Sequence, residues 1–206
     1  MPQGRAPPSE GGARLVTAPP PLLVARHAES AWNRTGRWQG RADPPLSDHG
    51  RAQARQLALA LRAARPARVV SSDLRRAAET AAIVARELGG LPHRLDPRLR
   101  EVDVGAWSGL TRREIERRWP EEHRRHRAGD PALRLGGGES LLEVRARARA
   151  ALLELLDAGP VPLLAVVHGG VIRALTGRGG WENTAWIGLD PAELGAAGRA
   201  PVLRSA

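Results

Sequence analysis

Short apolar runs that alternate with amphipathic stretches constrain the fold of this chain more than any other feature. The runs at 22–25, 68–72 and 163–167 have the length of buried strands, and a further strand is expected at 184–189. Between the runs, apolar residues recur at the three-to-four-residue spacing of a helix face. Strands that alternate with helices predict an α/β protein, built as a three-layer α/β/α sandwich with a mostly parallel central sheet.

Capping residues place several helix boundaries. Ser140 and Glu143 have the spacing of a capping box, which predicts that a helix begins there and ends near Asp157. Gly89 is suited to end a helix over 74–88, because glycine readily adopts the left-handed conformation that follows a helix C-terminus. The remaining helices are expected to begin near Ser47 and to include 171–175.

The chain is expected to hold one domain, at 21–190, between two flanking segments. Residues 1–20 are rich in proline and glycine and predict a disordered N-terminal arm, and 191–206 predict a C-terminal tail. Residues 110–138 interrupt the alternation of strands and helices, so we expect them to form an excursion and a candidate cap over the functional site.

Composition excludes several classes of protein. The chain has no cysteine, which excludes a disulfide framework, a thiolate zinc site and a cysteine nucleophile. Its apolar runs are far shorter than the roughly 20 residues that span a bilayer, so we expect a cytoplasmic protein with no membrane partner. The net charge of +10 comes from arginines spread along the chain without a nucleic-acid-binding motif, so nucleic acid is not an expected partner.

Polar residues directly follow three of the expected strands. Arg26 and His27 follow the first strand, the segment SSDLRRAAET with Arg76 follows the second, and His168 follows the third. Ligands of parallel sheets bind beyond the carboxyl ends of the strands, so we expect these side chains to meet in one crevice. Three strand ends that bring histidine, histidine and arginine together form a far more specific pattern than any one of them alone.

The chain resembles the histidine phosphatase superfamily, the phosphoglycerate mutase-like proteins, and within it the phosphatase branch. The resemblance covers about residues 20–176, with the motifs in family order. The matching segments are RHAES at 26–30, Asn33, WQG at 38–40, PLSDHGRAQA at 45–54, SSDLRRAAETA at 71–81, LREVDVGAWSGLT at 99–111, GGGES at 136–140 and VVHGGVIRAL at 166–175.

The resemblance implies roles for the matched residues. His27 would be the nucleophile that becomes phosphohistidine, and Glu101 the proton donor. Catalysis would also use Arg26, Arg76 and His168, and the substrate phosphate would be bound by Arg26, Asn33, Arg76, His168 and Gly169. The family works without a metal or a cofactor, so neither is expected.

Elementary chemistry is consistent with these roles. A neutral imidazole is nucleophilic at pH 7 without a separate base. Two guanidiniums and a second, protonated histidine can hold the negative charge that develops on the phosphoryl oxygens, so no metal is required. One carboxyl, that of Glu101, can give a proton to the leaving alkoxide and later take one from water.

Other residues compete for these roles or have simpler explanations. Arg75 adjoins Arg76, which we prefer because the family's arginine precedes a small residue, and Asp103 competes with Glu101. The tryptophans either line the pocket or pack in the core, and the arginine-rich run at 112–127 either is a solvated helix face or attracts an acidic substrate. The histidines expected to be solvated are His49, His93, His123 and His126, and the tryptophans in question are Trp32, Trp38 and Trp107.

Two departures from the family pattern stand out. Ala28 occupies a position where the family usually has glycine, which would cost on the order of 1 kcal/mol if the backbone there needs a positive φ. The segment after Leu175 is shorter than usual, which puts in doubt how the sheet edge closes, and Asn183 is the candidate for an asparagine that the family carries there.

These observations predict a metal-independent phosphomonoesterase of the histidine acid phosphatase type, acting on a small-molecule phosphate ester. The motifs SSDLRRA, GGGES and NTAW favour a sugar phosphate or a glycosyl-phosphoglycerate as substrate. Two alternatives remain: phosphoryl transfer of the phosphoglycerate mutase type, disfavoured by the short excursion and by Gly170, and a non-catalytic phospho-ligand binding protein. A homodimer is left open.

Overall fold

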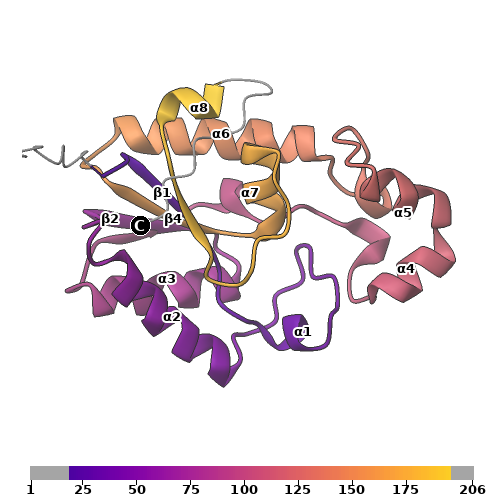
Figure 1. The fold of residues 1–206 in the computed structure, drawn as a ribbon, viewed down its shortest axis with the longest axis horizontal. Coiled ribbons are helices and arrows are strands. Elements are labelled where there is room, and N and C mark those ends of the chain that lie inside the picture. The colour runs from indigo at the N-terminus through magenta and orange to yellow at the C-terminus, as the bar shows by residue number, and fades with distance from the viewer. Residues whose placement is uncertain (1–18, 196–206) are drawn as a thin grey trace, which may run out of the picture.

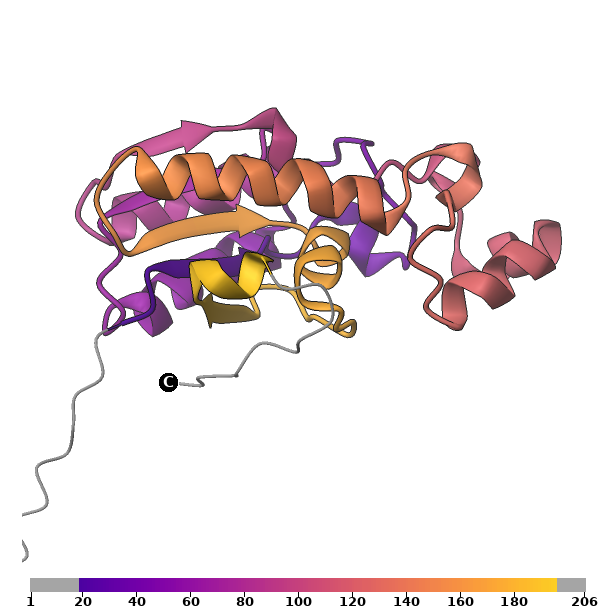
Figure 2. The same ribbon diagram turned by 90° about the horizontal axis from the view of Figure 1, so that it is seen from above.

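The computed structural model describes residues 19–195, which form a five-stranded sheet between two layers of helices (Figures 1 and 2). The order across the sheet is β3-β2-β4-β1-β5. All neighbours pair in parallel except β5, which is antiparallel to β1. The strands are β1 (Leu22–Arg26), β2 (Arg68–Ser71), β3 (His93–Leu95), β4 (Leu163–Val167) and β5 (Trp186–Leu189). The predicted three-layer, mostly parallel sandwich is confirmed.

The helices are divided between the two faces of the sheet. In Figure 1, α2 and α3 lie below the sheet, whereas α6 and α8 lie above it, and α7 packs against α6. The short α1 and the pair α4 and α5 lie beyond the sheet. Their bounds are α1 (Ala31–Arg34), α2 (Asp48–Leu61), α3 (Arg75–Glu87), α4 (Arg112–Arg118), α5 (Pro120–Arg127), α6 (Leu141–Asp157), α7 (Gly169–Thr176) and α8 (Pro191–Gly195).

The central strands are apolar on both faces because both faces are covered. In β1, Leu22 and Val24 join the cluster that contains α6 and α7 residues, whereas Leu23 and Ala25 join the cluster with α2 and α3 residues. The residues of β4 alternate in the same way. Continuous apolar runs at 22–25 and 163–167 were therefore the correct signal for buried parallel strands.

The expected caps form as the sequence indicates. The side chain of Ser47 accepts a hydrogen bond from the backbone of Gly50 and begins α2. Ser140 and Glu143 make a complete capping box at the start of α6, which ends at Asp157. The helix expected over 74–88 is α3, one residue shorter at each end.

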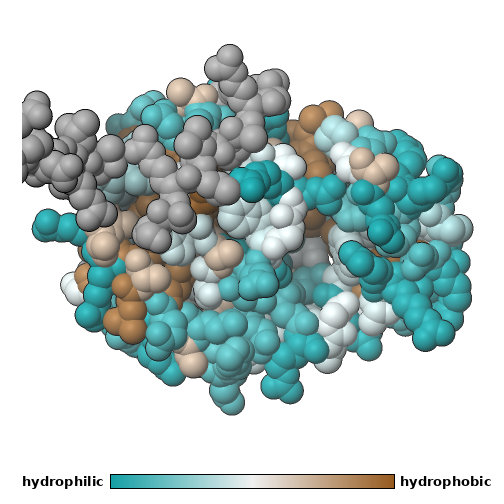
Figure 3. Space-filling model, in the orientation of Figure 1, coloured by the Kyte–Doolittle hydropathy of each residue, from teal (hydrophilic) through white to brown (hydrophobic). Residues whose placement is uncertain are grey.

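The segment 110–138 contains α4, α5 and a 3₁₀ turn, η3 (Leu135–Gly137), and lies at one end of the molecule. Its outer surface is hydrophilic (Figure 3), with exposed ion pairs such as Arg125 to Asp130 at 2.6 Å. This part of the arginine-rich run therefore forms a solvated helix face, which was one of the two roles considered for it. Whether the segment caps the site stays a proposal.

The short connection after Leu175 still closes the sheet. Helix α7 ends at Gly177, which has a left-handed conformation, and the chain returns as β5 along the free edge of β1. Within the tail expected at 191–206, residues Pro191–Gly195 form α8; the rest of that tail, and residues 1–18 of the expected arm, lie outside the described residues. None of the helices in the described part of the chain is long and apolar enough to cross a membrane.

Candidate active site

The carboxyl ends of β1 and β4 place two histidines side by side. Arg26 pairs with Val167 in the parallel register, so His27 and His168 are the next residues on adjacent strands. The backbone N–H of His27 donates to the carbonyl of Val167 at 2.9 Å, which extends the ladder by one residue. The two imidazole ring centroids lie 5.1 Å apart with the planes tilted by 59°. The predicted convergence of the two strand ends is present.

Arg76 reaches the same place from the start of α3. Its side chain is fully buried, and its Nη1 and Nη2 donate to the carbonyl oxygens of Ala42 and Gly40 at 2.7 and 2.8 Å. Its Nε donates to Nε2 of His27 at 3.3 Å. The neighbouring Arg75 is exposed. The structure thus places Arg76, and not Arg75, against the histidine.

The hydrogen bonds of His27 define its tautomer. Because Arg76 donates to Nε2, that nitrogen must carry a lone pair. The other nitrogen, Nδ1, lies 2.7 Å from the carbonyl oxygen of Ala28, so it carries the proton and donates. The ring is therefore fixed with its unprotonated Nε2 directed at Arg76.

The part of the cavity lined by Arg26, His27 and Arg76 is called the phosphate hollow below. Several buried nitrogens in it or next to it have no hydrogen-bond partner. They are Nε of Arg26 and both ring nitrogens of His168. Buried polar atoms are almost always paired. Unpaired nitrogens close together therefore indicate a ligand that accepts hydrogen bonds. A tetrahedral oxyanion such as a phosphoryl group meets that description, because its oxygens accept from several directions at once.

Burial and positive charge keep both histidines neutral in the free site. Burial, followed by the charges of Arg76 and Arg26, lowers the pKa of His27 well below its ordinary value, although the bond to Ala28 opposes this. The pKa of His168 is lowered well below its ordinary value by burial and by Arg76 and other nearby cations. His168 was expected to be protonated; in this electrostatic setting, protonation requires a bound anion.

Glu101 lies at the rim of the hollow, in a segment with neither helix nor strand. One carboxylate oxygen accepts from the backbone N–H of Gly170 at 3.2 Å, and the other accepts from the N–H of Val102 at 2.9 Å. Its negative charge raises the pKa of the Arg26 guanidinium, against a larger lowering by burial. The competitor Asp103 instead bonds to Gly105 and faces Arg41, away from the cavity wall.

A cavity of about 480 Å³ joins these residues to a wider wall. Of the residues expected to bind the phosphate, Arg26, Asn33, Arg76 and Gly169 line the cavity, whereas His168 is fully buried beside His27 and does not line it. The Oδ1 of Asn33 accepts from the backbone N–H of Ser30 at 3.0 Å, which leaves its Nδ2 for a ligand. Asn183 donates to the carbonyl oxygen of His27 at 3.0 Å, so it supports the backbone of His27 rather than lining the cavity.

Sequence reasoning missed part of the cavity wall. Unexpected lining residues include Arg37, Gln39, Arg112, His126, Arg173 and Trp181. Three of these are arginines: Arg173 lies in the matched segment VVHGGVIRAL and Arg112 begins the arginine-rich run considered for an acidic substrate, whereas nothing in the sequence singled out Arg37. Of the three tryptophans considered, Trp38 lines the cavity, Trp107 is fully buried, and Trp32 does neither.

The expectation of four solvated histidines is wrong for three of them. Only His49 is exposed. His93 is half-buried and bonded to the hydroxyl of Ser71 at 2.9 Å, and His123 is buried. His126 packs edge-on against Trp38 and Trp107, with ring centroids 5.2 and 5.8 Å away. Polar neighbours in sequence hid these tertiary contacts.

The concern about Ala28 also disappears. Ala28 is not among the non-glycine residues with positive φ, which in the described part of the chain are Arg65 and Thr184. It is buried, and its N–H donates to the hydroxyl of Thr80 at 3.1 Å. Alanine therefore fits here without backbone strain.

The fold and the site together define a class of α/β protein in which two histidines and two arginines lie together at the carboxyl edge of a parallel sheet. Comparison with known proteins agrees. The model of the histidine phosphatase superfamily (branch 1) matches residues 22–194. The chain belongs to this superfamily.

Individual relatives match over most of their length. The chain is 36% identical over 189 residues to glucosyl-3-phosphoglycerate phosphatase from Mycobacterium tuberculosis, covering 82% of this chain and 84% of that protein. It is 38% identical over 160 residues to phosphoglycerate mutase-like protein 4 of Arabidopsis thaliana, covering 76% and 70%. A solved structure of mycobacterial glucosyl-3-phosphoglycerate phosphatase with VO3 superposes with a TM-score of 0.75 at 36% identity, covering 81% of this chain and 88% of that one.

We predict that binding of an oxyanion draws a proton onto His168. An adjacent dianion raises the pKa that burial and the arginines have lowered, so net proton uptake is expected at pH 7. Sulfate is a suitable probe, because its own charge does not change near neutral pH. Titration calorimetry in buffers of different ionisation enthalpy measures the uptake, which should vanish in His168→Gln. Equal uptake in both proteins would assign the proton elsewhere.

We predict that Gly170→Ala folds normally but impairs proton donation. A Cβ at this position would overlap Oε1 of Glu101 and lie 2.9 Å from Cγ1 of Val102, and the flexible carboxyl is the group that can move. Proton transfer contributes about 10²–10⁴-fold, so we expect a fall on the order of 10-fold for alkyl phosphates and a smaller one for 4-nitrophenyl phosphate. Equal losses on both substrates would show that the backbone, not the acid, was disturbed.

Proposed function

We propose that this protein hydrolyses a small phosphomonoester through a phosphohistidine formed on His27, without a metal. The observation that carries the proposal is the pair of imidazoles 5.1 Å apart beside a buried arginine, where Arg26, His27 and Arg76 line one cavity and nitrogens of Arg26 and His168 have no hydrogen-bond partner. The family and the phosphatase among its relatives support phosphomonoester hydrolysis as the class of reaction.

The chemistry divides into two transfers. In the first, Nε2 of His27 attacks phosphorus, the ester P–O bond breaks, and Glu101 gives a proton to the departing alkoxide. In the second, the Glu101 carboxylate takes a proton from water as the water oxygen attacks phosphorus, and the P–N bond breaks. The products are an alcohol and inorganic phosphate, and the side chains return to their starting state.

The arginines act on the charge of the phosphoryl group. Arg26 and Arg76 present fixed cationic donors where the phosphoryl oxygens gather negative charge, and preorganised donors need no rearrangement during the reaction. His168 adds a donor once the anion has raised its pKa. This positive lining supplies the charge stabilisation for which other phosphatases use metal ions.

Retention of every part of this machinery favours an enzyme over a binding protein. A module that only bound phosphate would have no need of an unprotonated, arginine-facing Nε2 on His27, nor of a carboxyl at the rim. Hydrolysis is also favoured over mutase chemistry. Gly170 is one of the two sequence features that disfavour a mutase, and its backbone N–H donates to the carboxylate of Glu101.

Loss of phosphoryl labelling in His27→Ala is the direct test. With 4-nitrophenyl phosphate and excess EDTA, the natural protein should release phosphate, and rapid quenching should trap an acid-labile, base-stable phosphoryl group. His27→Ala should show neither. The exposed His49 provides the matched control, since His49→Ala should behave like the natural protein. Inactivity with EDTA, or conversion of 3-phosphoglycerate to 2-phosphoglycerate without phosphate release, would contradict the proposal.

The substrate we favour carries a second anionic group, a carboxylate, on its leaving group. Beyond the phosphate hollow the cavity wall contains Arg37, Arg112 and Arg173, and Glu101 is the only acidic residue among the described residues that line it. The local field is strongly positive: burial, then Arg173, His123 and Arg112, lowers the pKa of His126 to about 4. A cavity of about 480 Å³ falls within the usual range for whole metabolites.

A phosphoglycerate, with or without an attached sugar, has this chemistry. Its phosphate would occupy the hollow, its carboxylate would face the outer arginines, and a sugar would lie against Trp38 and Trp181, which line the same cavity. The name of the mycobacterial relative contains such a compound, which supports this substrate class without fixing the individual substrate.

The outer arginines should distinguish 3-phosphoglycerate from sn-glycerol 3-phosphate, which lacks the carboxylate. Hydrogen bonds to charged groups contribute about 1.5–3 kcal/mol, so Arg112→Gln or Arg173→Gln should lower kcat/KM for 3-phosphoglycerate by roughly 10-fold or more. Glycerol 3-phosphate should change little. Arg113 lies beside Arg112 on α4 but does not line the cavity, so Arg113→Gln is the control. Equal effects on both substrates would remove the carboxylate from the argument.

A further inference from the structure

The segment that carries Glu101 has no regular structure of its own. It lies between two 3₁₀ turns, η1 (Pro97–Leu99) and η2 (Gly105–Trp107), and belongs to no strand. A proton donor must nevertheless be held to within a fraction of an ångström of its working position. Something outside the segment has to fix its backbone.

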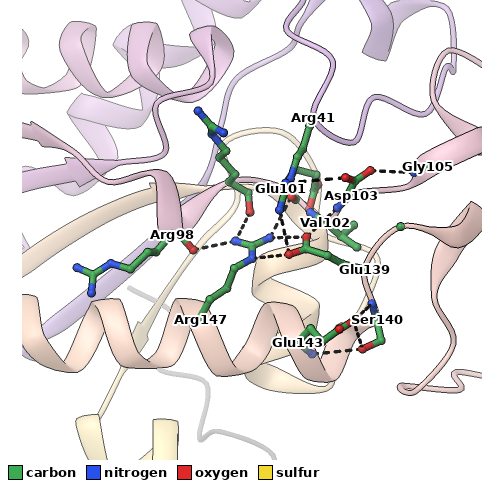
Figure 4. Close-up of polar contacts among 12 residues, drawn as sticks. Arg41, Arg98, Glu101, Val102, Asp103, Gly105, Glu139, Ser140, Glu143 and Arg147 are labelled. Carbon is green, nitrogen blue, oxygen red and sulfur yellow. Dashed lines mark hydrogen bonds and ion pairs between the residues drawn. The ribbon is translucent and has the colours of Figure 1, made fainter.

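Arg147, on α6, makes the required contacts. Its guanidinium donates to the carbonyl oxygen of Arg98 in η1 at 2.7 Å, and to those of Arg100 and Glu101 in the segment at 2.7 and 3.0 Å (Figure 4). The Arg147 side chain is largely buried, with 18% of its surface exposed, and it does not line the cavity. It therefore contacts the backbone of Glu101 without bordering the cavity.

Glu139 holds both Arg147 and the far side of the segment. Its carboxylate accepts from Nε and Nη2 of Arg147 at 3.0 and 2.9 Å, and from the backbone N–H of Asp103 at 2.9 Å (Figure 4). Arg41 adds an ion pair to the same carboxylate at 3.0 Å. Arg147 and Glu139 together thus bond to the backbone on both sides of Glu101.

The glycines before Glu139 allow this close approach. A Cβ at Gly136 would overlap the carbonyl oxygen of Val104, and one at Gly138 would overlap that of Asp103. The backbone N–H of Glu139 donates to the Asp103 carbonyl at 2.8 Å, so the two segments lie backbone to backbone. The GGGES motif, which the catalytic steps leave unexplained, brings Glu139 and the start of α6 against the acid-bearing segment.

We propose that the Arg147–Glu139 pair is a positioning device for the proton donor: it fixes the backbone on both sides of Glu101 so that the carboxyl stays at the N-terminus of α7, beside the phosphate hollow. This inference rests on the proposed function, because it assigns a role relative to Glu101. Arginine is the side chain that suits the task, since its five N–H donors lie in a fixed plane and bind a carboxylate and several carbonyls together. Lysine has the charge but not that geometry.

The test compares a good and a poor leaving group. Proton donation matters for sn-glycerol 3-phosphate and much less for 4-nitrophenyl phosphate. Arg147→Gln and Arg147→Lys should each lower the ratio of the glycerol phosphate rate to the nitrophenyl phosphate rate by about 10-fold or more. Arg149→Gln is the matched control, because Arg149 lies on the same helix and donates to the carbonyl of Leu194, far from Glu101 in the chain. That variant should leave the ratio unchanged.

A double-mutant comparison separates positioning from a general loss of structure. Glu101→Gln alone should reduce the ratio, and adding Arg147→Gln should reduce it no further if both act through the same carboxyl. A further drop in the double variant, or equal slowing of both substrates by Arg147→Gln and Arg147→Lys, would overturn the proposal. If both Arg147 variants fail to fold, Glu139→Gln decides, since it keeps an acceptor for Asp103 and should lower the ratio in a folded protein; an unchanged ratio would count against the proposal.

Failure of this inference is distinguishable from failure of the proposed function. If the natural protein hydrolyses both esters and Glu101→Gln shows the leaving-group effect, the function stands whatever the Arg147 variants do. If the natural protein forms no phosphohistidine and releases no phosphate, the function itself is wrong.

Discussion

The burial of Arg76 is the constraint on which the rest of the site depends. Placing a guanidinium inside a protein is costly unless each donor finds an acceptor. Three of its five N–H donors are paired here, with the carbonyls of Gly40 and Ala42 and with Nε2 of His27. Burial still lowers the pKa of Arg76 to about 10, so the group stays charged at neutral pH. The buried Arg76 side chain therefore fixes the 40–42 loop, the start of α3 and the tautomer of His27.

The sheet supplies the precision that this arrangement needs. Parallel register places His27 and His168 next to each other without either side chain having to be ordered separately. The cations beside them repel one another and have Glu101 as their nearest carboxylate along the cavity wall of the described chain. Folding thus places these cations close together before any ligand binds. A bound anion would reduce the repulsion between them.

Features that depend on residues close together in the chain could be predicted from the sequence, and features that depend on distant residues mostly could not. The strands β1 and β4 contain continuous apolar runs at 22–25 and 163–167, and the capping box of α6 lies within four residues, so both features were predictable. Strand β3 was missed because its residues, His93–Leu95, are half-buried or exposed at the sheet edge and carry no apolar pattern. The convergence of strand ends predicted the two histidines and Arg76. Nothing local distinguishes Arg147 from Arg145 or Arg149, because its role depends on carbonyls nearly 50 residues earlier in the chain.

The phosphate hollow and the leaving-group wall come from different parts of the fold, and this has a consequence for specificity. The hollow is built by the ends of β1 and β4 and by the start of α3, whose positions the core fixes. The outer wall is built by Arg37 in a loop, by Arg112 and His126 in the excursion, and by Trp181 in the connection before β5. Substitutions in that wall can change which ester enters without moving the nucleophile. Glu101 lies where the two parts meet. Because its backbone is held by Arg147 of α6 and not by the outer wall, its carboxyl can keep its place while the wall adapts to a different leaving group.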